Sequence, residues 1–189
     1  MPLRATDNPL VVPLLGLLLE QPRHQYALLT ALRERYRHLR VRTGSVYTLI
    51  RSLEEVGWIE PIRPGAGDNA PVAYQLTPDG IDQFRGKVVT GLQDTEHADA
   101  TAFVTALAYI GILDRSTARA ILGKRLDALR RRVDDLERAI HDADVAPVQM
   151  IEVAFSASQT RHDIDWLEHF RRQIADPDYA WPVDDGNEP

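Results

Sequence analysis

Helical segments and a β-hairpin follow one another in a fixed order within the first 85 residues. Apolar density predicts a buried helix over residues 9–20, and apolar residues at steps of three or four predict an amphipathic helix over residues 24–36. A third helix is predicted over residues 45–56, with Thr43 or Ser45 as its N-cap and Gly57 as its C-cap. The order of these segments leaves few architectures open.

The segment after the third helix has the pattern of a hairpin. Residues 58–63 and 72–76 are predicted strands, and residues 64–71 form a turn-rich tip between them. Thr77 and Pro78 then have the cap and first-turn positions of another helix. Three helices, a hairpin and a further helix make up a winged helix-turn-helix, in which the third helix enters the major groove of DNA. We therefore expect a mainly α fold with a small β-hairpin.

The predicted third helix has one apolar and one polar face. Its packing stripe consists of Val46, Leu49, Ile50, Leu53 and Val56. Its other face carries hydroxyl and guanidinium groups, which reach phosphates or base edges in protein–DNA complexes. The candidate contacts on this helix are Thr43, Ser45, Tyr47, Thr48 and Arg51. The alternatives are an ordinary solvated face and, for Tyr47, packing against the second helix.

Basic charge is concentrated around this helix although the chain as a whole carries a net charge of −6. Residues 23–51 contain seven arginines and one glutamate, a local net charge of +6. Local positive charge favours a polyanionic partner more than the sum over the chain does. Further candidate DNA contacts lie at the start of the second helix, in the basic stretch before the third, and in the hairpin: His24, Gln25, Tyr26, Arg40, Arg42 and Arg63. Tyr26 has the alternative of being a core residue.

The second half of the chain is predicted to be helical. We expect a domain over residues 1–85, a linker over 86–99, a helical dimerisation and effector domain over 100–176 and an acidic, disordered tail over 177–189. From residue 117 the apolar positions follow a heptad spacing typical of a coiled coil. These positions are Leu122, Leu126, Leu129, Val133, Leu136 and Ile140. They are buried either inside the monomer or against a second subunit, and we expect a homodimer.

Several classes of protein are excluded or disfavoured. The chain has no cysteine, so it forms no disulfide or thiolate metal site, and His162 and His169 lack the spacing of a metal site. No nucleophile triad, P-loop or glycine fingerprint is present, so we expect neither an enzyme nor a cofactor. The longest apolar run, residues 10–19, is too short to span a membrane and lacks the flanks of a signal peptide, which predicts a cytoplasmic protein.

Three segments carry a resemblance to a known family: "LLGLLLEQPRHQYALLTALRERY" (14–36), "RTGSVYTLIRSLEEVGWIE" (42–60) and "YQLTPDG" (74–80). In these segments the sequence resembles the PadR family of bacterial transcriptional regulators. Gln25 replaces a glycine that is usual in the family, Thr48 replaces a proline, and Val72 and Ala73 replace a basic pair before Tyr74. The missing basic pair is expected to weaken contacts between the hairpin and phosphates.

The resemblance implies a dimeric DNA-binding regulator that responds to small aromatic or drug-like molecules. Candidate effector contacts are Phe103, Phe155, Trp166 and Phe170, with plain dimer core as the alternative. A second hypothesis is a winged-helix module that binds proteins as a scaffold and has lost DNA binding. Salt-dependent retention of the protein on duplex DNA distinguishes the DNA-binding regulator from the protein-binding module.

Overall fold

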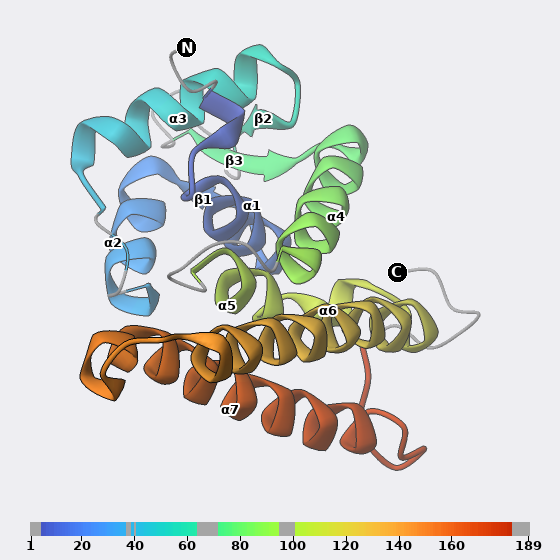
Figure 1. Ribbon diagram of the computed structural model, residues 1–189. Coiled ribbons are helices and arrows are strands. Elements are labelled where there is room, and N and C mark those ends of the chain that lie inside the picture. Colours follow the sequence, from blue (N-terminus) through green and yellow to red (C-terminus); the bar gives the residue numbers. More distant parts are fainter. Residues whose placement is uncertain (1–4, 37–38, 40, 64–71, 95–100, 183–189) are drawn as a thin grey trace. The chain divides into compact units, whose positions relative to one another are not determined.

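The computed structural model describes residues 5–36, 39, 41–63, 72–94 and 101–182. The chain divides into two compact units, Met1–Val88 and Val89–Pro189. Figure 1 labels the elements. The N-terminal unit contains η1 (Ala5–Asp7), α1 (Val11–Glu20), β1 (Arg23–His24), α2 (Gln25–Arg35), α3 (Thr43–Glu55), β2 (Ile59–Ile62), β3 (Ala73–Leu76) and the larger part of α4 (Pro78–Gln93).

The three predicted helices of the N-terminal unit surround one apolar core. α1 is buried on almost every side because seven of its ten residues are inaccessible. α2 buries Leu28, Leu29 and Leu32 on one face, as the spacing predicts. α3 buries Val46, Leu49, Ile50 and Leu53, whereas Val56 of the predicted stripe follows the end of the helix and is half exposed.

A small antiparallel sheet closes this core, with strand order β1-β3-β2. β2 and β3 form the predicted hairpin, in which Ile59 lies opposite Leu76. β1 was not predicted, because two residues before a helix leave no periodic signal; it places Arg23 opposite Tyr74. The predicted tip, residues 64–71, lies outside the described residues.

The predicted caps are partly correct. Gly57 adopts a φ of 76° after α3, a conformation that costs glycine little, and the amide of Trp58 donates to Leu53 O at 2.9 Å. The amide of Gly80 donates to Thr77 Oγ1 at 3.0 Å, so Thr77 caps α4 as expected. The N-cap of α3 is Arg42 and makes no side-chain cap, which corrects the prediction for Thr43 or Ser45. Thr43 Oγ1 instead accepts from Arg33 at 2.9 Å.

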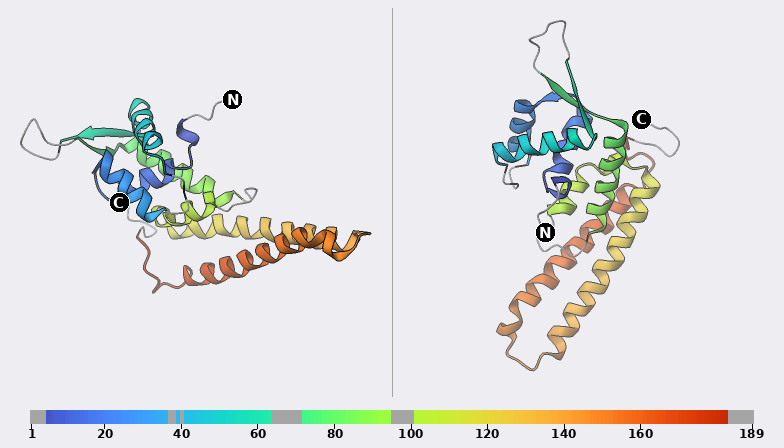
Figure 2. Two further views of the ribbon diagram at one scale, coloured as in Figure 1. Left: turned by 90° about the vertical axis from the view of Figure 1, so that its left-hand side faces the viewer. Right: turned by 90° about the horizontal axis from the view of Figure 1, so that it is seen from above.

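The C-terminal unit is a helical hairpin with short helices before it. The predicted helix over residues 100–112 is divided into α5 (Thr101–Leu107) and η2 (Ile110–Ile112). α6 (Arg115–Asp142) and α7 (Ile151–Gln173) are long and antiparallel, with η3 (Pro147–Met150) between them (Figure 2). Arg130 pairs with Glu168 at 2.6 Å and Arg161 pairs with Glu137 at 2.5 Å across the two helices. These two ion pairs join α6 and α7 in their antiparallel arrangement.

Two predicted boundaries differ from the structure. Residues 86–93 of the predicted linker are the last turns of α4, and residues 95–100 lie outside the described residues. The tail is ordered further than expected, because Arg115 donates to the carbonyls of Asp176 and Tyr179, and Trp181 Nε1 donates to Leu113 O at 2.8 Å. Among the described helices, none has both the length and the hydropathy needed to cross a bilayer.

Candidate nucleic-acid interface

The polar face of α3 lies open to solvent. Thr43, Ser45, Tyr47, Thr48 and Arg51 are all exposed, and the residues between them on the other face are buried. This division follows from the 3.6-residue period, since the apolar side chains at steps of three or four point into the core. Tyr47 retains 38% of its accessible surface, so it is not sequestered against α2. The helix therefore offers hydroxyl groups and one guanidinium group to an external partner.

Several of the arginines that contribute to the positive charge of residues 23–51 form ion pairs with glutamates. Arg23 and Arg35 both contact Glu20, and Arg51 Nε donates to Glu55 at 3.1 Å. Glu20 and Glu55 lie just outside residues 23–51, so the charge count over that window omitted them. The local positive charge is consequently smaller than the sequence suggests. Arg42 is exposed.

The start of α2 places three of the predicted residues beside α3. His24 is the N-cap of α2, and its Nδ1 accepts from the amide of Ala27 at 3.2 Å. Neutral His24 therefore carries its proton on Nε2, which makes that nitrogen a donor. Tyr26 is 69% exposed, which is incompatible with the alternative that it belongs to the core.

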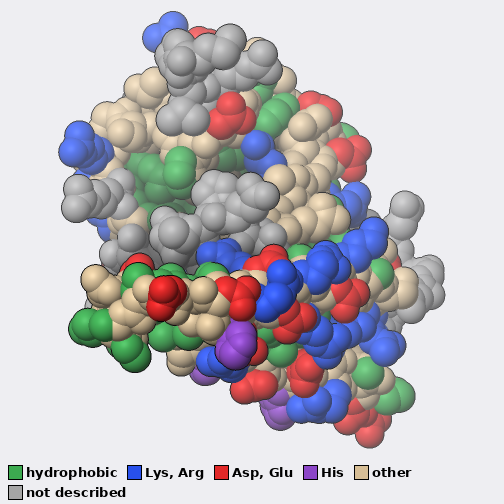
Figure 3. Space-filling view, viewed as in Figure 1, with side chains coloured by type: hydrophobic (Ala, Val, Ile, Leu, Met, Phe, Trp, Pro, Cys, Tyr) green, Lys and Arg blue, Asp and Glu red, His purple; other side chains and the backbone are tan. Residues whose placement is uncertain are grey.

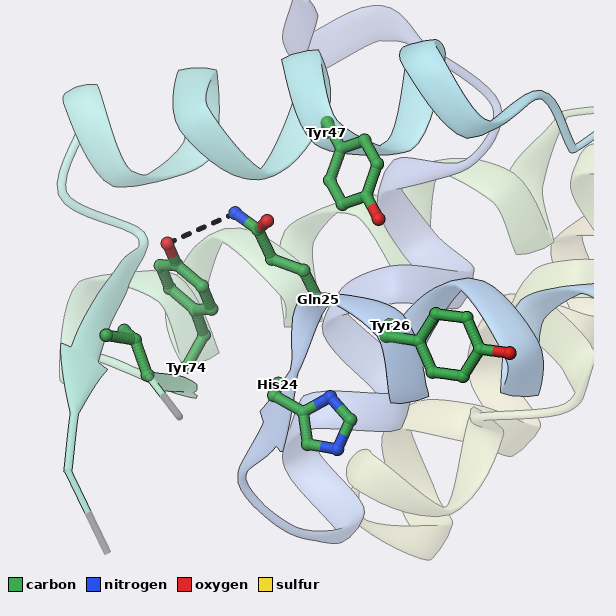
Figure 4. A pocket seen from close by; sticks show the side chains of 6 residues that line it. His24, Gln25, Tyr26, Tyr47 and Tyr74 are labelled. Carbon is green, nitrogen blue, oxygen red and sulfur yellow. Dashed lines mark hydrogen bonds between the residues drawn. The ribbon is translucent and has the colours of Figure 1, made fainter. Parts of the chain in front are cut away.

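A hollow of about 430 Å³ lies between the start of α2, the start of α3 and β3 (Figure 4). Its lining consists of His24, Gln25, Tyr26, Tyr47, Val72 and Tyr74. Gln25 Nε2 donates to Tyr74 Oη at 3.3 Å, which joins the first turn of α2 to the hairpin. Tyr74 was not among the predicted contacts; the register of β1 and β3 brings it here, and that register has no signature in the sequence.

The remaining candidates for DNA contact are less well defined. Arg63 follows β2 and is exposed at the base of the hairpin. Arg40 lies outside the described residues. The structure thus brings His24, Gln25, Tyr26 and Tyr47 together, and it places Arg63 at the end of a different element.

The predicted dimerisation residues are mostly buried within one chain. Leu122, Leu126, Leu129 and Val133 are at most 8% exposed, which agrees with the intramolecular alternative, whereas Leu136 and Ile140 are partly exposed. Beyond them, at the end of the hairpin, apolar side chains are open to solvent, and Figure 3 shows hydrophobic groups gathered there. These side chains are Val145, Val148, Ile151 and Phe155, each more than half exposed.

The four predicted effector residues occupy three different environments. The ring of Phe103 lies under the guanidinium of Arg125, with 3.7 Å between the guanidinium carbon and the ring centroid. Trp166 and Phe170 stack at 5.1 Å, and Phe170 meets Tyr179 edge-on. Phe155 is 64% exposed at the end of the hairpin.

Two charged groups of the C-terminal unit have shifted pKa values. Hydrogen bonds from Ser116 and then from the amide of Thr117 lower the pKa of Asp114 from 3.8 to about 2. Burial lowers the pKa of Arg125, an effect opposed by the charges of Asp163 and Asp94. Among the described residues, no group of His, Asp or Glu side chains is arranged to bind a metal ion.

The helices α1 to α3 and the β2–β3 hairpin define a winged helix-turn-helix domain. Residues 14–86 match the model of the transcriptional regulator PadR-like family. This part of the chain is therefore similar to the PadR-like family of transcriptional regulators, in agreement with the resemblance seen in the sequence motifs.

Solved structures of this class are similar over most of the chain. Bacillus subtilis PadR in complex with operator DNA is 17% identical, with 88% of this chain and 99% of that chain covered and a TM-score of 0.40. Bacillus subtilis PadR with p-coumaric acid is 16% identical, with coverages of 89% and 100% and a TM-score of 0.41. A PadR-like regulator from Bacillus cereus is 16% identical, with coverages of 87% and 94% and a TM-score of 0.37. No match was found among curated proteins.

Proposed function

We propose that this protein binds double-stranded DNA through α3 and regulates transcription as a homodimer. The observation that carries the proposal is the polar face of α3, which stays exposed on a helix whose other face closes the core of a winged helix. In helix-turn-helix proteins the N-terminal residues of this helix contact base edges. Ser45, Tyr47 and Thr48 have that position here.

The surrounding candidates act on the DNA backbone in this proposal. His24, Gln25 and Tyr26 contact phosphates beside the first turn of α2, and Arg42 and Arg51 supply positive charge. Arg40 and Arg63 extend this charge along the backbone. Phosphate contacts of this kind set the register of the protein on the duplex, and the groove contacts set its specificity.

In the proposed homodimer, the second copy of the chain supplies a second α3, which enters the DNA groove as the first does. Leu136 and Ile140, only partly covered in the monomer, continue into the exposed apolar side chains at the end of the hairpin, and this surface supports a contact between two copies. Two reading helices on one side of a duplex bind half-sites about 10 base pairs apart. The selected DNA is then expected to be palindromic.

Sequencing of DNA selected from a random pool by the full chain tests the proposal. We expect enrichment of a two-fold symmetric site, and a Tyr47→Ala, Arg51→Ala variant that binds it at least tenfold more weakly. Arg119→Ala, which removes an equal charge from an exposed position on α6, is the matched control and should bind as the unaltered chain does. A pool without enrichment would instead favour the protein-binding module.

We further propose that the protein is a repressor whose DNA affinity changes with a small aromatic or drug-like effector. Exposed or half-exposed aromatic groups near α6 and α7, among them Trp166 and Phe170, support this part of the proposal. p-Coumaric acid, bound in the Bacillus subtilis structure, is a reasonable first compound. Its addition should change the affinity for the selected DNA, and a Trp166→Ala variant should lose that response.

A further inference from the structure

The hollow beside α3 is lined by donors of hydrogen bonds that carry no charge. Three tyrosines, a glutamine and a histidine line it, and Val72 supplies an apolar edge; in Figure 4 the Gln25 amide meets the Tyr74 hydroxyl, whereas the Tyr26 hydroxyl points away from them. Among the residues that the structure describes, no lysine or arginine belongs to the lining. Neutral side chains of these types are common donors to phosphate oxygens in protein–DNA complexes. The hollow has a volume of about 430 Å³ and is largely open to solvent, so a group on an external partner can approach its lining.

Tyr74 is the most firmly positioned of these donors. Its side chain is 8% exposed, and its Oη accepts a hydrogen bond from Gln25 Nε2 (Figure 4). Because this bond uses the oxygen of Tyr74 as an acceptor, the hydroxyl proton is left to donate to another group. Gln25 also keeps its second amide hydrogen. The pair therefore presents two donors from a fixed position, and Gln25 stands where the family usually has a glycine.

Three of the neighbouring arginines that the structure describes are engaged with carboxylates. Arg23 and Arg35 contact Glu20, and Arg51 contacts Glu55. Such exposed pairs are worth little individually, but each must be broken before its arginine neutralises a phosphate alone. Uncharged side chains are consequently expected to make some of the contacts with the DNA backbone.

We propose that this hollow holds a backbone phosphate of bound DNA through neutral donors, with Tyr74 as a contact residue and Gln25 as the residue that positions it. The inference rests on the proposed DNA-binding function and specifies how the backbone is held. A neutral donor displaces no condensed counterion, whereas each arginine that neutralises a phosphate adds about 0.9 to the slope of log affinity against log salt. The two kinds of contact can therefore be separated experimentally.

The test measures the affinity of the full chain for two unrelated duplexes of mixed sequence between about 50 and 200 mM salt. Tyr74→Phe removes the hydroxyl but keeps the ring, and it should weaken binding about threefold to tenfold at every salt concentration. The loss should be equal on both duplexes, because a phosphate carries no sequence information. The salt slope should not change. Gln25→Ala should produce a similar loss, and no further loss should appear when it is combined with Tyr74→Phe.

Two comparisons make the result specific. Arg42→Gln, at an exposed cation, should reduce the salt slope by about 0.9. Gln75→Ala removes the adjacent hydrogen bond on β3, from Gln75 Nε2 to Glu60 at 2.8 Å, and should leave affinity unchanged. Thermal unfolding of each variant separates loss of contact from loss of fold.

Three results would overturn the inference. If Tyr74→Phe binds like the unaltered chain while Arg51→Ala, which lies outside the lining, binds weakly, the hollow is not a contact, although the DNA-binding function stands. A salt slope that falls with Tyr74→Phe would show that the hydroxyl acts through a cation. Failure of the unaltered chain to bind any duplex would remove the proposed function as well.

Discussion

Gly80 in the first turn of α4 has no room for a side chain. A Cβ atom at this position lies 1.9 Å from the carbonyl oxygen of Trp58, and backbone cannot move aside as a flexible side chain can. We expect Gly80→Ala to lower the free energy of unfolding by about 1–3 kcal/mol in urea denaturation. A Cβ atom at Gly86, on the same helix, meets no atom of another segment within 4 Å among the described residues, and Gly86→Ala should raise stability by up to about 1 kcal/mol. Equal effects of the two substitutions would contradict this account.

Asp114 caps α6 and should make the stability of the C-terminal unit depend on pH. Its carboxylate accepts from the amide of Thr117 and from Ser116 Oγ, both at 2.7 Å, and its pKa is lowered from 3.8 to about 2. Because the folded state holds the proton less tightly than the unfolded state, the stabilisation is complete above pH 4 and is lost as the pH falls toward 2.

Asp114→Ala should therefore cost about 1 kcal/mol near neutral pH. The difference between this variant and the unaltered chain should shrink between about pH 4 and pH 2 in chemical denaturation. Glu152→Ala, at an exposed site in the first turn of α7, removes a carboxylate that accepts no hydrogen bond from the described residues, and it serves as a comparison. A difference that stays constant with pH would show that the carboxylate charge is not responsible.

At the scale of elements, α1 to α3 and the β2–β3 hairpin could be predicted because each has a strong local signal. Steps of three or four define the buried face of α3, and Gly57 marks its end. β1 and the contact between Gln25 and Tyr74 could not be predicted, since they depend on pairing between residues about fifty positions apart. The ordered part of the tail depends likewise on distant hydrogen bonds from Arg115.

Arg125 of α6 secures the end of α4. Its Nη1 donates to the carbonyls of Leu92 and Asp94, its guanidinium lies on the ring of Phe103, and it is only 5% exposed. α4 ends at Gln93, and the last carbonyls of a helix lack donors from the following turn, so Arg125 acts as a C-terminal cap of α4.

We expect Arg125→Ala to lower the free energy of unfolding by about 2–3 kcal/mol, because two charge-assisted hydrogen bonds and the ring contact are lost. Arg125→Met, which retains the apolar volume without a buried charge, should cost less. Amide exchange at residues 90–94 should increase in both variants and more in the alanine variant. No change in exchange there would show that Arg125 does not hold the helix end.

At the scale of the whole molecule, the exposed apolar end of the α6–α7 hairpin should determine the oligomeric state. A Val148→Asp, Phe155→Asp variant places two charges on this surface. We expect its dimer to dissociate more than about tenfold more readily, since burying an unpaired charge is unfavourable. Sedimentation equilibrium measures this, and binding to the selected DNA should weaken in parallel. Ala120→Asp, exposed elsewhere on α6, is the control; an unaltered chain that is monomeric would refute the prediction.

The boundary between the two units runs through the interior of α4, after Val88. A shortened gene that ends at codon 86 would therefore remove Val88, whose side chain is completely inaccessible, and leave the helix without its last two turns. A recombinant N-terminal domain that is meant to fold independently should retain the residues through Gln93. We expect the fragment that ends at Gln93 to be obtained in higher yield and to unfold at a higher temperature than the fragment that ends at residue 86.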